Sequence, residues 1–216
     1  MILEIYTDAS IKTYPNGRVF GCSGAICPII GQSSFTINQD TTNNQSELIA
    51  IYIGIKLVKQ IIDCNPLYKE IHLYSDSQFG IFGLSKWMNG WVKTLDSNEI
   101  IYGSNKEPVK NQQLFYMILE YLCENNLRIK LFHQPGHIAY NNPMKLKEAN
   151  EVFKKSNGYY ISEDDIYKIS FYNDLVDRAT RTKLENIDPS NYLMFNGDKQ
   201  MCTLKFPLNY KDYIIM

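Results

Sequence analysis

The first forty residues alternate between apolar and polar side chains with a period of two, which predicts β-strands. Strands are expected over residues 2–6, 18–30 and 33–38, and turn residues at 15–17 and 31–32 separate them. Turns this short join antiparallel neighbours. The opening segment is therefore predicted to form an antiparallel meander.

Beyond residue 40 the apolar positions recur every three or four residues, and helices alternate with strands. Polar residues at 41–44 are good capping residues, and they open a helix expected over residues 45–63. This alternation predicts an α/β fold in which a five-stranded mixed sheet, the meander plus parallel strands, carries helices packed on it. The later elements are expected as strands at 71–75 and 127–133, helices from 77 to 91 and over 109–126, and a loop at 96–108.

The last third of the chain follows a break at Pro135-Gly136. Two short helices are expected over residues 145–155 and 162–169, and a further helix over 171–182. The aromatic-rich segment 186–216 gives no clear pattern, and no element is predicted there. We therefore expect a domain over residues 1–182 and a C-terminal extension of unknown role over 183–216.

Composition limits the class of protein. The chain has 216 residues, of which 44% are hydrophobic and 21% charged, which suits one folded domain with an extension. Its net charge of -1 does not by itself suggest a nucleic-acid binder, because such proteins usually carry a basic surplus. If the protein binds nucleic acid, clustered basic residues or bound metal ions would have to supply the positive charge at the binding site.

Cysteine usage and the N-terminus predict an intracellular, cytoplasmic protein. The five cysteines form no C-x-x-C pair, so we expect free thiols in a reducing compartment. Met1 leads directly into a strand-like run without a basic segment, so no signal peptide is expected. The longest apolar helical run, residues 48–58, is too short to cross a membrane. The free cysteines are Cys22, Cys27, Cys64, Cys123 and Cys202.

Three acids lie at the edges of predicted elements: Asp8 after the first strand, Glu47 in the first helical turn, and Asp76 after the fourth strand. Buried acids without partners are costly, so these must be solvated, paired or bound to metal. Carboxylates without a His or Cys cluster suit Mg²⁺ or Mn²⁺ better than zinc. Taken singly, each acid could equally be a helix cap or a solvated surface residue.

Motifs around these acids resemble those of type-one ribonucleases H. Residues 5–10 resemble the opening Y-T-D-G-S, residues 41–48 resemble T-T-N-N-x-x-E-L, and residues 74–78 resemble T-D-S-Q. They occur in the order of the family and cover most of residues 1–182. Further matches are W-x-x-x-W at 87–91, P-V-K-N at 108–111, G-H at 136–137 and N-E-x-x-D at 173–177.

The resemblance implies an RNase H-like fold and a metal-dependent endonuclease that hydrolyses the RNA strand of RNA–DNA hybrids. Asp8, Glu47, Asp76 and Asp177 would hold two divalent ions, Mg²⁺ or Mn²⁺. His137 would lie on a mobile loop and assist proton transfer or product release. His72 and His133 match no motif and are interpreted as ordinary strand residues.

The resemblance also implies a set of substrate contacts. Amide side chains would contact the minor groove, where 2′-hydroxyls mark the RNA strand. Thr42 matches a DNA-phosphate contact, and the two tryptophans fall in the substrate-handling helix, although their spacing also suits core packing. The predicted substrate-binding residues are Ser10, Thr42, Asn43, Asn44, Gln78, Trp87 and Trp91.

The chain departs from the pattern of the family in several places. Ala9 replaces a glycine, Gly90 stands where many relatives have asparagine, and the region around Lys86 is less basic, so hybrid affinity is expected to be modest and salt-sensitive. An insert over about residues 139–172 separates His137 from Asp177. It could extend the substrate surface with its lysines; the more conservative interpretation is a solvated helical excursion.

Because the insert changes the spacing between His137 and the motif that contains Asp177, a second acid of that motif is an alternative fourth ligand. This acid is Asp174, one helical turn from Asp177. Two other functions stay open. One is a non-catalytic hybrid-binding module, which the clustered acids argue against, and the other is a DNA-acting nuclease of the same superfamily. The protein is expected to act as a monomer.

Overall fold

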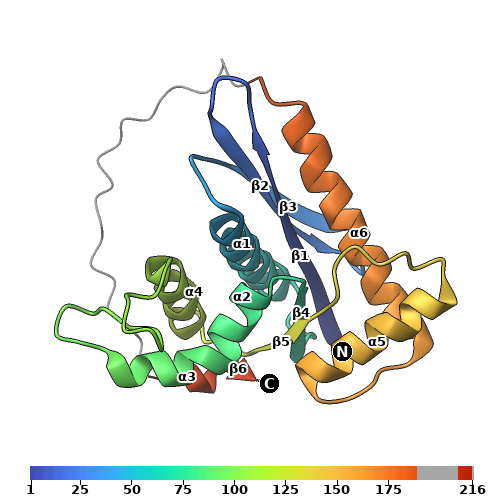
Figure 1. Ribbon diagram of the computed structural model, residues 1–216. Helices are drawn as coiled ribbons and strands as arrows, with labels where there is room; N and C mark the ends of the chain where they lie inside the picture. Colours follow the sequence, from blue (N-terminus) through green and yellow to red (C-terminus); the bar gives the residue numbers. More distant parts are fainter. Residues whose placement is uncertain (189–208, 216) are drawn as a thin grey trace.

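The computed structural model describes residues 1–188 and 209–215. A mixed sheet in the order β3-β2-β1-β4-β5-β6 runs through the molecule (Figure 1). β1, β2 and β3 form the antiparallel meander, whereas β4, β5 and β6 extend the sheet in parallel from β1. The strands are β1 (Ile2–Thr13), β2 (Val19–Cys27), β3 (Gln32–Gln39), β4 (Glu70–Ser75), β5 (Ile129–His133) and β6 (Ile214–Ile215).

Helices cover both faces of this sheet. α1 and α4 lie on one face, and α5 and α6 lie on the other (Figure 1). The longer helices are α1 (Asn43–Cys64), α4 (Gln112–Glu124), α5 (Pro143–Asn157) and α6 (Glu163–Glu185). The shorter ones are α2 (Gln78–Phe82), the π-helical turn η1 (Gly83–Trp87), α3 (Met88–Trp91), η2 (Val92–Thr94) and η4 (Tyr210–Asp212).

The period-two pattern of the strands explains why there are two cores. Leu73 and Leu131 face the α1/α4 side, where they join the larger hydrophobic cluster. Their neighbours Tyr74 and Phe132 point to the opposite face and stack with ring centroids 5.1 Å apart. Both faces of the parallel strands are therefore buried, as expected when helices cover a sheet on both sides.

The five predicted strands and the α/β class are confirmed, with two differences in the strands. β1 continues to Thr13 because it pairs with β2 along its whole second half, so Asp8 lies inside the strand opposite Gly24 and not at its end. The sheet also gains a sixth strand, β6, which pairs with Ile129 and Lys130 of β5. The predicted helix over 109–126 begins only at Gln112.

The C-terminal extension contributes to the sheet edge. The backbone N–H of Ile129 donates to the carbonyl oxygen of Tyr213 at 2.9 Å, just before β6. No element was predicted for residues 186–216; of these, 189–208 and 216 lie outside the described residues, as does Cys202. Within the described part of the chain no helix has the length and apolarity needed to cross a bilayer.

The insert is packed against the sheet, so the interpretation as a solvated excursion is wrong. Phe153 of α5 and Ile166 and Ile169 of α6 are buried against Tyr74 and Phe132. The two helices predicted over 162–169 and 171–182 are one continuous helix, α6, whose N-cap Ser162 accepts from the N–H of Asp165. The insert therefore forms half of the second core.

Candidate active site

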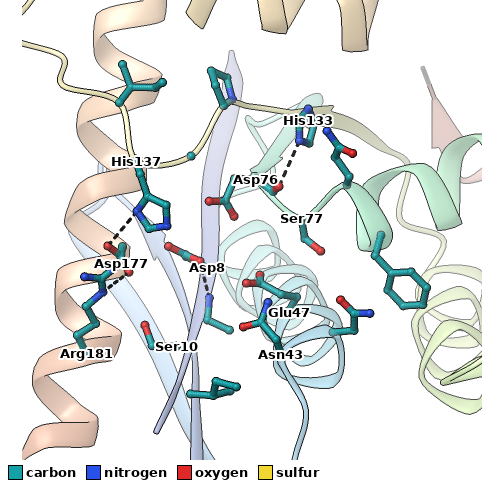
Figure 2. Close-up of a pocket in the computed structure, with 18 of the residues that line it drawn as sticks. Asp8, Ser10, Asn43, Glu47, Asp76, Ser77, His133, His137, Asp177 and Arg181 are labelled. Atoms are coloured by element: carbon teal, nitrogen blue, oxygen red, sulfur yellow. Dashed lines mark hydrogen bonds and ion pairs between the residues drawn. The ribbon is translucent and has the colours of Figure 1, made fainter. Parts of the chain in front are cut away.

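A cavity of about 1000 Å³ opens where β1 and the ends of β4 and β5 meet the start of α1 and the side of α6. Figure 2 shows the acids that line it converging on one space from four different elements. Asp8 comes from β1, Glu47 from the residue that follows the first turn of α1, Asp76 from the residue after β4, and Asp177 from α6. The fold thus collects residues that are far apart in the sequence.

Local structure positions Glu47 and Asp8 beside Asp76. α1 begins at Asn43 because Thr42 and Gln45 form a reciprocal capping box, which places Glu47 just after the first turn, and not within it as the sequence predicted. Asp8 is held by β-pairing on both sides of β1, and its Oδ1 accepts a hydrogen bond from the N–H of Ala9 at 2.7 Å. Oxygen atoms of Asp8, Glu47 and Asp76 lie within 4.8 Å of one another.

Two of these three carboxyls, those of Asp8 and Glu47, lack the partners that buried charges need. Asp8 is 3% exposed and Glu47 6%, and their outer oxygens, Oδ2 and Oε2, accept no hydrogen bond from the described residues. Burial, followed by the charge of Asp76, raises the pKa of Asp8 well above its ordinary value. Burial and the charge of Asp8 do the same to the pKa of Glu47, and burial raises the pKa of Asp76.

Unpaired buried carboxylate oxygens so close together fit a divalent cation. A hard ion such as Mg²⁺ or Mn²⁺ prefers oxygen ligands, and its charge would remove the repulsion that raises these pKa values. The described residues bring no cysteine or histidine into this group of three acids. The donor set therefore suits magnesium or manganese better than zinc.

Asp177 lies in the same cavity but is paired differently. Its Oδ1 accepts from Nε of Arg181 at 2.8 Å, and its Oδ2 lies 3.7 Å from Nδ1 of His137 (Figure 2). Asp174 is instead paired with Arg178 at 2.6 Å and does not line the cavity. This geometry favours Asp177 over Asp174 as the fourth acid of the site.

The loop that carries His137 touches the acid cluster. A Cβ atom added to Gly136 would collide with the Asp76 carboxylate, so glycine permits the close approach of backbone and acid. His137 itself adopts a left-handed φ of +53°, which non-glycine residues rarely adopt. Its side chain is 68% exposed at the mouth of the cavity, where a bound substrate could reach it.

His133, interpreted from sequence as an ordinary strand residue, supports Asp76. It lines the cavity and is buried. Its Nε2 lies 3.2 Å from the carbonyl oxygen of Asp76, which can only accept, so Nε2 carries the proton. Its Nδ1 then accepts from the Ser156 hydroxyl at 2.8 Å. Burial lowers the pKa of His133, which favours this neutral form.

A second buried pair also reaches Asp76. Nε2 of Gln134 donates to Oδ1 of Asn173 at 2.5 Å, and a hydrogen bond from Asn173 to the carboxyl of Asp76 opposes the rise of its pKa. Sequence reasoning assigned no role to either residue. Asn173 could have been found as the first residue of the N-E-x-x-D-like motif, whereas no motif marks Gln134.

The predicted substrate residues fall into three groups. Ser10, Asn43, Asn44 and Gln78 line the cavity, although the hydroxyl of Ser10 is already hydrogen-bonded to that of Thr180 at 2.8 Å. The Thr42 side chain caps α1 and does not line the cavity.

The tryptophans form the third group and line a separate hollow beside α3. Trp87 is 42% exposed, so core packing does not explain it. Trp91 packs on Phe115 of the larger core with ring centroids 5.5 Å apart, so here the core interpretation holds.

Comparison with known proteins agrees with this arrangement. The sequence model of the RNase H family matches residues 2–154. The chain belongs to the RNase H family. The match includes Asp8, Glu47, Asp76 and His137, whereas Asp177 lies beyond it.

The chain aligns with nearly the whole length of two relatives that are named ribonuclease H. The protein of Acetivibrio thermocellus is 33% identical over 160 residues, which is 71% of this chain and 97% of the relative. That of Pseudomonas fluorescens is 27% identical over 158 residues, 73% of this chain and 95% of the relative. Among solved structures, LC9-RNase H1, described as a type 1 RNase H, aligns with a TM-score of 0.46 and 15% identity over 76% of this chain and 79% of that one.

Proposed function

We propose that this protein is a ribonuclease H that hydrolyses the RNA strand of RNA–DNA hybrids with the help of divalent cations. One observation carries the proposal: in a member of the RNase H family, three carboxylates lie together in an open cavity, and buried oxygens of two of them, Asp8 and Glu47, have no hydrogen-bond partner among the described residues. A structural role for these acids would require partners for them. A cation at this position provides the partner and the chemistry together.

Asp8, Glu47 and Asp76 would hold the cation, and Asp177 completes the ligand set of a site for two ions. Mg²⁺ is the expected metal, and Mn²⁺ can replace it at oxygen ligands. Bound cations stabilise the charge that develops on a phosphodiester during hydrolysis and activate water as the nucleophile.

His137 has the position and exposure of a residue that handles protons late in the reaction. Its imidazole stands at the mouth of the cavity beside Asp177, 3.7 Å away, which can orient it. Histidine can give or take a proton near neutral pH, so it can protonate the departing oxygen or assist release of the product.

Recognition of the hybrid rests on the amide side chains of Asn43, Asn44 and Gln78, which line the cavity next to Glu47. An amide both donates and accepts, as a 2′-hydroxyl does. A DNA duplex has no 2′-hydroxyl, so this contact would favour the hybrid over DNA as the substrate. A non-catalytic binder would not gain from clustered acids that repel phosphates.

The proposal is tested by incubating the protein with labelled RNA–DNA hybrid, RNA duplex and DNA duplex, each with Mg²⁺ or Mn²⁺ and with chelator. We expect cleavage of the RNA in the hybrid alone, and only with metal. Cleavage of DNA duplex would favour the DNA-acting nuclease, and binding without cleavage would favour the hybrid-binding module. The monomeric state and the cytoplasmic location stay predictions.

A further inference from the structure

A second cavity of about 430 Å³ lies on the α5 side of the sheet, between η1 and the end of α5. Its wall includes three lysines, Lys86 from η1, Lys130 from β5 and Lys155 from the last turn of α5. We propose that this cavity binds a backbone phosphate of the nucleic-acid strand that runs out of the catalytic cavity. The inference rests on the proposed function in so far as the substrate is nucleic acid.

The charges in this cavity favour an anion. Glu70 neutralises Lys130, with Nζ and Oε1 2.5 Å apart. Lys86 and Lys155 have no acidic partner within ion-pair distance among the described residues, and no acid lines the cavity. Because the whole chain has a net charge of -1, this local surplus of two cations is a feature of the cavity and not of the general composition.

At the C-terminal end of α5, Lys86 reduces the repulsion that the helix carbonyl oxygens would exert on a phosphate. A helix C-terminus exposes carbonyl oxygens with partial negative charge. Nζ of Lys86 covers one of them by donating to the carbonyl oxygen of Ser156 at 2.7 Å, and it lies 4.2 Å above the ring of Phe82. The ammonium group is thereby held in place at the cavity wall, where a phosphate oxygen can share it.

The two cavities are neighbours. The His133 side chain lines the catalytic cavity, and its Nδ1 is hydrogen-bonded to the hydroxyl of Ser156, which lines the lysine cavity. An imidazole that lines one cavity is therefore hydrogen-bonded to a residue that lines the other. In the proposed path, a strand that passes Asp76 continues past the lysines, and its successive phosphates are spaced by about 3.4 Å along the axis of the duplex.

This cavity exists because of the insert, which supplies Lys155, Ser156 and Tyr159 to its wall. The less basic region around Lys86 would alone give weak phosphate binding. The insert compensates by adding Lys155 to the same cavity wall as Lys86. In this proposal the insert extends the substrate surface, and the cavity is the specific site at which it does so.

The chain offers a matched control for the test. Lys154 and Lys155 are adjacent in the last turn of α5, so each loss removes one charge from the same helix end. Lys154 does not line the cavity; its Nζ lies 4.0 Å above the ring of Tyr160. Any general effect of charge or helix stability would therefore appear in Lys154→Ala and Lys155→Ala alike.

Hybrid affinity is measured over a series of salt concentrations for both variants in an Asp76→Asn background, which blocks the proposed cleavage. Each lost phosphate contact lowers the slope of log K against log salt by about one. We expect this loss, with several-fold weaker binding at about 0.1 M salt, for Lys155→Ala and not for Lys154→Ala. Progressively shorter hybrids should remove the difference once the strand no longer reaches the cavity.

The inference would be overturned if the slope of log K against log salt were the same with lysine and with alanine at position 155. It would also be overturned if Lys154→Ala and Lys155→Ala lowered the slope equally. Competition by inorganic phosphate or a mononucleotide that disappears in Lys155→Ala, without any effect on hybrid binding, would show a free-phosphate site and would also overturn it. Failure of the proposed function appears separately, as intact hybrid in the metal-dependent cleavage assay.

Discussion

The catalytic cavity has two sides that differ in how their acids are satisfied. On the β1–α1–β4 side, Asp8 and Glu47 keep unpaired oxygens in a buried setting, and their pKa values are raised. On the α6 side, Asp177 is paired with Arg181 and lies beside His137. Under the proposed function, the acids of the first side are stabilised in their charged form by a cation, whereas Asp177 on the second side already has the cationic partner Arg181. We therefore expect the two sides to respond differently to substitution, metal and pH.

The largest effect should follow from Asp8→Asn. Loss of a ligand that stabilises developing charge removes several kcal/mol, and about 4 kcal/mol corresponds to about a thousandfold in rate. The same change removes a repelling charge, so the metal-free protein should melt at a higher temperature. Steady-state cleavage and thermal unfolding with chelator measure the two effects.

Asp63→Asn is the control for this substitution, because Asp63 is exposed on α1 and, in the described part of the chain, is paired only with Lys59. It should leave both activity and metal-free stability close to wild type. If Asp8→Asn destabilised the metal-free protein, the repulsion inferred for this side of the cavity would be wrong.

On the other side, Asp177→Asn should reduce activity about ten- to a hundredfold, with partial recovery at higher metal concentration. The smaller loss is expected because Arg181 already offsets much of the charge of Asp177. Asp174→Asn, one helical turn away and outside the cavity, should retain nearly full activity. A reversed order of these two variants would make Asp174 the functional acid.

Loss of the hydrogen bonds of His133 should lower metal affinity less than loss of a metal ligand, but more than a change in ordinary side-chain packing. His133→Phe keeps the ring shape and leaves the carbonyl oxygen of Asp76 unpaired, so we expect about a tenfold loss of metal affinity. His133→Gln retains a donor that can reach this oxygen and should recover most of it. Metal titration of activity, with folding checked by circular dichroism, distinguishes a positioning role from a purely structural one.

The smallest effect concerns pH and the metal-free protein. The raised pKa values of Asp8, Glu47 and Asp76 mean that the folded state binds more protons than the unfolded state above the ordinary carboxyl pKa of about 4. Stability without metal should therefore fall as pH rises from about 4 through the raised pKa values. Metal needs deprotonated ligands, so the rise in melting temperature caused by Mg²⁺ should grow over the same range.

The acids of the first side could be predicted from the sequence because local signals fix them. The capping box at Thr42 sets the start of α1 and hence the place of Glu47, and the end of the β4 pattern sets Asp76. Asp8 was placed at a strand end because the polar residues after Tyr6 interrupt the apolar run. Pairing with β2, which is a long-range interaction, carries the strand on to Thr13.

The insert could not be predicted in the same way. Its few buried side chains, such as Ala149 and Phe153, are separated by charged residues, and their partners Tyr74 and Phe132 lie far away in the sequence. Ser170 interrupts the apolar pattern and suggested two helices, yet it is buried inside the continuous α6. β6 has only two residues, which is too short for a period-two pattern to be recognised.

Whether Asp8, Glu47 and Asp76 bind a divalent cation can be measured by calorimetric titration of the protein with Mn²⁺ at neutral pH. We expect the wild-type protein to bind Mn²⁺, the Asp8→Asn variant to bind it at least about tenfold more weakly, and the Asp63→Asn variant to bind it as the wild type does. Equal Mn²⁺ affinity in the wild-type protein and Asp8→Asn, or no binding by either, would contradict cation binding by these three acids.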